Sequence, residues 1–145
     1  MTLRIFYACG ASPNANEISQ STLWKDNLFD SLVEMGHEVI PFRRDVTGHF
    51  TTYKNYKTSR MQQRKFNRYR AALQSALIAE ISEEHRRQPI DLFFSYFWSE
   101  ICAPETIDRI RALGITTVNW YCNGSYQFDL VADLAPHFDL SLIHI

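Results

Sequence analysis

Cysteine is scarce in this chain of 145 residues, and the three cysteines lie far apart. Cys9, Cys102 and Cys122 form no CxxC pair, and no cysteine–histidine cluster has the spacing of a zinc site. An odd number of isolated cysteines also argues against a disulfide framework. We therefore expect buried free thiols and no metal site.

Long apolar runs and an excess of charge of one sign are also lacking. No apolar run approaches the roughly 20 residues of a membrane span, and the N-terminus lacks the longer apolar region and cleavage site of a signal peptide. The formal net charge of −1 gives no overall field toward nucleic acid or membrane. We expect one cytoplasmic domain over residues 1–145, with no transmembrane segment and no nucleic-acid partner.

The sequence also lacks the glycine-rich motifs that bind phosphates. Neither G-x-G-x-x-G nor the lysine-containing P-loop pattern occurs, although a small-residue loop follows the first apolar run at residues 9–16. Gly10 and Ser12 in this loop are candidate ligand contacts, because small residues leave room for a close backbone approach. A plain strand-to-helix turn explains the same residues equally well.

Short apolar runs and helical periodicities alternate along the chain. The runs predict strands over residues 5–8, 37–40, 91–97, 115–118 and 138–142. Apolar residues at helical spacing predict helices over residues 22–35 and 61–85, after Pro104, and around residues 128–134. Gly36 and Gly114 each stand between a helix and a strand, where a left-handed residue ends many helices.

This order predicts a Rossmann-like α/β fold, with five parallel strands and helices on both faces. The third strand is the most apolar and shows almost no alternation, which indicates burial on both faces. Placing it at the centre gives the strand order 2-1-3-4-5. The strand order then reverses between strands one and three, which is where open α/β sheets bind ligands.

Polar and aromatic side chains follow two of the predicted strands. Ser99 and Glu100 follow the third, and the stretch Asn119-Trp120-Tyr121-Cys122-Asn123-Gly124-Ser125 follows the fourth. The candidate substrate contacts there are Ser99, Asn119, Tyr121, Asn123 and Ser125. Two other interpretations remain open: the aromatic residues belong to the core, and Asn123-Gly124 is only a turn.

Glu100 is the candidate catalytic residue, because it is the carboxylate nearest the end of a predicted central strand. As a general base it would take a proton from an acceptor hydroxyl. The alternative places Glu100 in the first turn of the next helix, where the helix dipole favours an acidic residue.

Residues 54–70 contain seven basic residues and no acidic one. Such a stretch, with aromatic residues interleaved, is able to contact phosphates or an anionic polymer. The solvated face of a helix is the favoured interpretation. An apolar stripe at helical spacing consists of Phe66, Tyr69, Leu73, Leu77 and Ile81. Most basic positions fall on the opposite side of the helix from this stripe, which favours the solvated-face interpretation.

Residues 93–99, 113–114, 118–128 and 135–139 together resemble the N-terminal half of CgeB-like glycosyltransferases, which are similar to the two-domain GT-B class. The likeness extends over nearly the whole chain and is strongest over residues 91–140. It implies that this chain is the acceptor-side domain, facing a C-terminal domain that binds the nucleotide-sugar donor. It implies no metal bound to a protein carboxylate motif and no cofactor bound by this part alone.

The resemblance also implies that the donor domain is missing beyond residue 145, so the chain alone should transfer no sugar. Two interpretations of residues 141–145 stay open: they are native to the protein, or they are a tail foreign to the family. The alternative function is a Rossmann-like or receiver-like module that binds a ligand or regulates without catalysis. A receiver is disfavoured because Cys9 and Gly10 stand after the first strand, where receivers carry paired acidic residues.

Overall fold

The computed structural model describes residues 1–9, 25–44, 46, 59–121 and 125–143, with the side chains of Ser125, Tyr126 and Ile143 left out. Within these residues the five strands are β1 (Arg4–Ala8), β2 (Glu38–Pro41), β3 (Leu92–Ser95), β4 (Thr116–Tyr121) and β5 (Leu140–Ile143). All neighbouring strands are parallel, and their order is β2-β1-β3-β4-β5. The predicted fold class and strand order are therefore confirmed.

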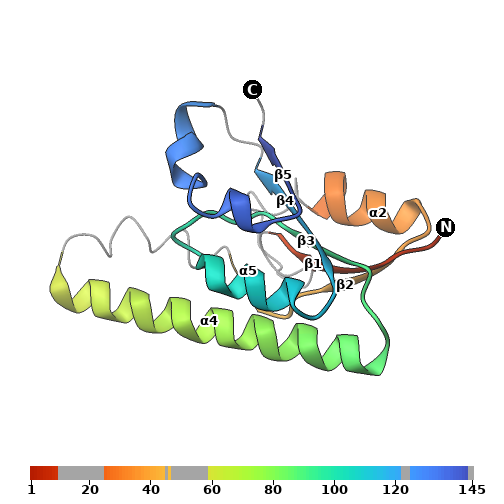
Figure 1. Cartoon of the computed structure of the whole chain (residues 1–145), viewed down its shortest axis with the longest axis horizontal. Coiled ribbons are helices and arrows are strands. Elements are labelled where there is room, and N and C mark those ends of the chain that lie inside the picture. Colours follow the sequence, from red (N-terminus) through yellow and green to blue (C-terminus); the bar gives the residue numbers. More distant parts are fainter. Residues whose placement is uncertain (10–24, 45, 47–58, 122–124, 144–145) are drawn as a thin grey trace.

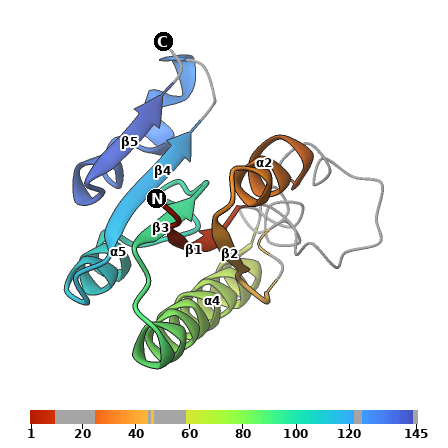
Figure 2. The same cartoon turned by 90° about the vertical axis from the view of Figure 1, so that its right-hand side faces the viewer.

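Helices cover the sheet on both faces, as Figure 2 shows. The π-helix η1 (Lys25–Phe29) continues into α2 (Asp30–Glu34) on one face, and α4 (Arg60–Arg87) and α5 (Pro104–Arg111) lie on the other. Two short 3₁₀ helices, η2 (Ser125–Leu130) and η3 (Ala135–His137), connect β4 to β5.

The core consists of two clusters, one on each face of the sheet. Phe6 and Phe93 point toward α4 and α5, where they join Leu77, Ile81 and Ile107. Alternate residues of the same strands point toward α2, and this second cluster contains Ile5, Tyr7, Phe94 and Tyr121. Burial on both faces accounts for the unbroken apolar character of residues 92–97.

The two glycine joints adopt the predicted conformation. Gly36 has φ +85° and Gly114 has φ +81°, a region that strains residues with a Cβ atom. The amide of Gly36 donates to the Val33 carbonyl, and the amide of Gly114 donates to the Arg111 carbonyl. Each helix therefore turns directly into the following strand.

Several element boundaries differ from the prediction. β3 ends at Ser95 rather than 97, and β4 continues to Tyr121 rather than ending at 118. After β4 the chain forms 3₁₀ helices in place of the predicted apolar helix, with Val131 and Leu134 fully buried and Phe128 exposed. Of the predicted helix over 22–35, the part before Lys25 lies outside the described residues.

An ion-pair network at the amino edge of the sheet joins α4 to β1 and β2. Arg4 is almost fully buried. Its Nε lies 2.8 Å from Glu38 Oε1, and its Nη2 lies 3.1 Å from Glu84 Oε2. The carboxylate of Asp91 accepts the Arg4 amide at 2.7 Å. These contacts fix the end of α4 against the strands, and the other end of α4 extends past the opposite edge of the sheet (Figure 1).

Candidate site at the carboxyl edge of the sheet

The carboxyl ends of β1 and β3 lie next to each other, with Ala8 opposite Ser95 in the register. The connections leave these two strands toward opposite edges of the sheet, because β1 leads to β2 and β3 leads to β4. This position is the topological switch point of the fold, where doubly wound sheets bind ligands. The residues that follow β3 therefore lie where the sequence predicts a site.

The segment after β3 forms a tight turn that carries Trp98, Ser99 and Glu100, all half-buried. The amides of Ile101 and Cys102 donate to the Trp98 carbonyl at 2.9 and 3.2 Å. Glu100 lies in this turn, ahead of the first residue of α5, Pro104. The interpretation that placed Glu100 in the first turn of the helix is therefore wrong.

Ser99 connects this turn to two other elements. Its amide donates to the Leu130 carbonyl of η2 at 2.9 Å. Its own carbonyl accepts a hydrogen bond from Arg70 Nη2 of α4 at 2.7 Å. The turn is thus held between α4 and η2, which orients the side chains of Trp98 and Glu100 at the carboxyl edge.

Asn119 has a structural role within the sheet. It is fully buried, and its Oδ1 accepts from the Phe97 amide at 2.8 Å and from Ser95 Oγ at 3.1 Å. Its Nδ2 donates to the Phe97 carbonyl at 3.0 Å. The carboxamide therefore replaces the ladder hydrogen bonds where β3 leaves β4. As a result, the Asn119 side chain is occupied by contacts inside the protein.

The aromatic residues at this edge pack against one another. Tyr121 is fully buried, and its ring stacks on Tyr96 with centroids 5.7 Å apart. Trp98 meets Tyr96 edge to face at 5.7 Å and contacts Tyr121 at 6.5 Å. The core interpretation of Tyr121 is confirmed, while Trp98 and Trp120 keep part of their surface exposed.

The start of α5 is capped by a side chain from α4. Gln74 Oε1 accepts the Ala103 amide at 3.2 Å and the Thr106 hydroxyl at 2.6 Å. Cys102 lies just before this helix and is buried, and burial raises the pKa of its thiol to about 12. A thiol with that pKa stays protonated near neutral pH, which makes it a poor nucleophile.

The remaining predicted site residues are not brought together by the described structure. Gly10, Ser12 and Asn123 lie outside the described residues, and Ser125 begins η2 without a described side chain. No group of three or more metal-ligating side chains occurs in the part of the chain that the structure describes. No helix among the described residues is long and apolar enough to cross a membrane.

A second polar location, absent from the sequence-based hypotheses, lies at the opposite edge of the sheet. An open hollow of about 560 Å³ is lined by residues that include Asp108, Arg111, Gly114 and Asp139. Asp139 Oδ2 accepts the Thr117 amide at 2.8 Å, and Asp139 Oδ1 lies 2.9 Å from Arg111 Nη2. The hydrogen bond from the Thr117 amide is the main cause that lowers the pKa of Asp139. These polar groups satisfy one another, so the hollow is a weaker candidate than the carboxyl edge.

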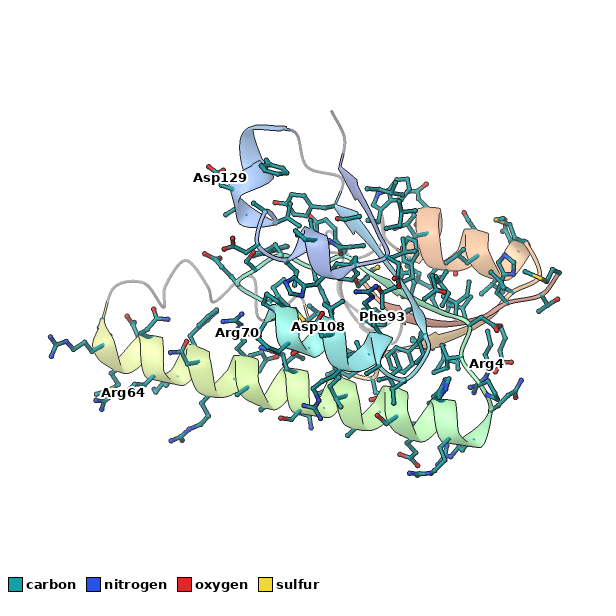
Figure 3. All side chains as sticks on the ribbon, in the orientation of Figure 1. Arg4, Arg64, Arg70, Phe93, Asp108 and Asp129 are labelled. Atoms are coloured by element: carbon teal, nitrogen blue, oxygen red, sulfur yellow. The ribbon has the colours of Figure 1, made fainter. Side chains whose placement is uncertain are left out.

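Sequence reasoning counted Arg70 only among the basic residues of 54–70 and missed its position on the inner side of α4. The predicted stripe placed Tyr69 on the buried face of α4, but Tyr69 is 43% exposed. Arg70 instead lies half-buried on the inner side of α4, near the turn after β3 (Figure 3). A finer reading of the helical period would have found it, since Phe66, Arg70, Leu73 and Leu77 share one face at spacings of three and four.

No family model, curated protein or solved structure matches the chain. The fold and the site geometry therefore rest on the structure itself. The resemblance to CgeB-like glycosyltransferases stays a prediction.

Proposed function

We propose that this chain is the acceptor-side domain of a glycosyltransferase that moves a sugar from a nucleotide-sugar donor to an acceptor hydroxyl. The observation that carries the proposal is the position of the Trp98–Ser99–Glu100 turn at the switch point between β1 and β3. This is the edge at which a Rossmann-like sheet offers its ligand site. The sequence resemblance supplies the reaction class.

Each residue of the turn has a chemical role in this proposal. The partly exposed ring of Trp98 packs against one face of a sugar, as aromatic rings do with apolar ligand surfaces. Glu100 takes the proton from the attacking hydroxyl as general base. Arg70 and Leu130 hold the turn through the backbone of Ser99, which keeps both side chains in place.

The donor nucleotide sugar binds, in this proposal, to a second Rossmann-like unit that faces the carboxyl edge. That unit stabilises the leaving nucleotide, so the present chain contributes the acceptor site and the base. The alternative, a ligand-binding module without catalysis, would use the same edge and would need no such unit.

The test is a sugar-transfer assay with a panel of nucleotide sugars and simple sugar acceptors. The chain is assayed alone and joined to any reading frame that follows it in the gene. We expect turnover only in the joined protein, and a loss of about 10²–10⁴-fold in kcat for Glu100→Gln. The matched control is Glu105→Gln, because Glu105 is an exposed carboxylate of α5 and is not part of the turn.

Two results would contradict the proposal. Full activity of the Glu100→Gln protein would remove Glu100 as the base. Acceptor binding without any transfer by the joined protein would favour the non-catalytic module.

A further inference from the structure

Arg70 differs from the other partly buried or paired arginines of the described structure. Arg4, Arg43, Arg87 and Arg111 each form an ion pair with a carboxylate. Among the described residues no carboxylate lies within ion-pair distance of Arg70, whose one described hydrogen bond runs from Nη2 to the Ser99 carbonyl. A half-buried guanidinium without a counter-charge is costly, because part of its hydration has been lost.

Two further polar atoms at this place lack a partner. Arg70 Nε and Ser99 Oγ are both buried, and neither forms a hydrogen bond in the structure. The two residues are already joined by the 2.7 Å hydrogen bond, so the unsatisfied atoms belong to one location. Most buried donors in native proteins have a partner, so these two unsatisfied atoms at one place require an explanation.

The surrounding charge favours an anion. The first 20 residues of α4, numbers 60–79, contain five basic residues and no acidic one. Helix N-termini carry a partial positive charge and usually attract acidic side chains, but the first turn of α4 contains none. Figure 3 shows Arg64 near the free end of α4 and Arg70 closer to the sheet.

We propose that Arg70 and Ser99 bind an anionic oxygen group, a phosphate or a carboxylate, carried by the acceptor sugar. The guanidinium supplies the charge and directional N–H donors, and the Ser99 hydroxyl supplies one more donor. The inference rests on the proposed function for the identity of the ligand as an acceptor. It restricts the acceptor to a phosphorylated or acidic sugar.

The experiment follows the side-chain Nε–H resonance of Arg70 in the full ¹⁵N-labelled chain. The added probes are inorganic phosphate, glucose 6-phosphate, glucuronate and glucose. We expect a saturable shift with the anionic probes and at least tenfold weaker binding of glucose. The phosphate and carboxylate probes, compared at equal concentration, show which anion the site prefers.

Variants separate a site from general attraction to a basic helix. With binding followed by the backbone amide shifts of residues 96–102, Arg70→Gln should weaken the binding of glucose 6-phosphate at least tenfold, and Ser99→Ala should weaken it by a smaller factor. Arg68→Gln is the matched control, because Arg68 is exposed on the same helix and its loss should change the affinity less than twofold. Arg70→Lys keeps a positive charge and lacks Nε. It therefore serves as the second variant if Arg70→Gln fails to fold.

The inference is overturned if no anionic probe shifts the Arg70 resonance, or if Arg68→Gln weakens binding as much as Arg70→Gln. Failure of the proposed function gives a different pattern. Anion binding at Arg70 without sugar transfer by the joined protein would leave this inference standing and would remove the transferase. Transfer to neutral sugars without any preference for anions would leave the transferase standing and would remove this inference.

Discussion

Single side chains determine how the carboxyl edge is shaped, and Asn119 is the most consequential of them. We expect Asn119→Ala to destabilise the chain by about 2–4 kcal/mol, because it leaves the buried amide and carbonyl of Phe97 without the hydrogen bonds that Asn119 supplies. Thr116→Ala, at the exposed start of the same strand, should change the stability by less than about 1 kcal/mol. Urea unfolding of both variants measures the difference. Equal stabilities would show that the Asn119 contacts contribute nothing.

Asp139 is the residue at which stability should respond to acid. Its pKa is lower in the folded chain than in the unfolded chain, chiefly because the Thr117 amide donates to it. The ionised carboxylate therefore stabilises the fold above its unfolded pKa, and this stabilisation is lost as the pH falls through the folded pKa. We expect Asp139→Asn to lower the Tm by roughly 3 °C near pH 7 and by progressively less below about pH 4.

Thermal unfolding of the Asp139→Asn chain between neutral and acid pH checks this expectation. Asp129→Asn is the control, since Asp129 is exposed on η2 (Figure 3). A Tm difference that stays constant or grows toward acid pH would contradict the role given to Asp139.

At the scale of elements, composition and periodicity predicted the strands and the glycine joints but misplaced several ends. β4 was expected to end at Val118, because the β-branched run of residues 115–118 ends there. The structure continues to Tyr121, since the Asn119 carboxamide is satisfied by the Phe97 backbone. That contact joins segments 22 residues apart, so no local pattern reveals it. The apolar stripe of α4 was right at four of five positions and wrong at Tyr69.

The exposed basic face of α4 should matter little for folding. Arg60, Arg64 and Arg68 are all exposed. Replacing each by Gln should change the free energy of unfolding by no more than about 0.5 kcal/mol per site. Denaturant unfolding of the triple variant provides the measurement. A loss of several kcal/mol would show that these arginines make contacts essential to the fold.

At the scale of the whole molecule, the sheet should be most stable at its centre. β3 pairs with β1 on one side and β4 on the other, and Phe93 and Ser95 are fully buried. We expect the amides of residues 92–96 to exchange with solvent more slowly than those of the edge strand β2. Native-state hydrogen exchange resolves the two groups. Rapid exchange over residues 92–96 would contradict the central position of β3.

The candidate site was predictable as a place and only partly as a set of residues. The strand order located the switch point, and Ser99 and Glu100 do lie in the turn there. Asn119 and Tyr121 were chosen for the same edge, yet both side chains are buried among protein contacts. The inward position of Arg70 escaped notice because the predicted stripe assigned Tyr69, and not Arg70, to the buried face of α4.

The measurement that tests the central claim most directly is a map of backbone amide shifts in the ¹⁵N-labelled chain during titration with glucose 6-phosphate. The account predicts that the largest shifts fall on residues 96–102, around the turn that holds Trp98, Ser99 and Glu100. It predicts no comparable shifts around Arg111 and Asp139, which line the hollow at the opposite edge. Shifts confined to that hollow, or no saturable shift anywhere, would contradict a ligand site at the carboxyl edge of the sheet.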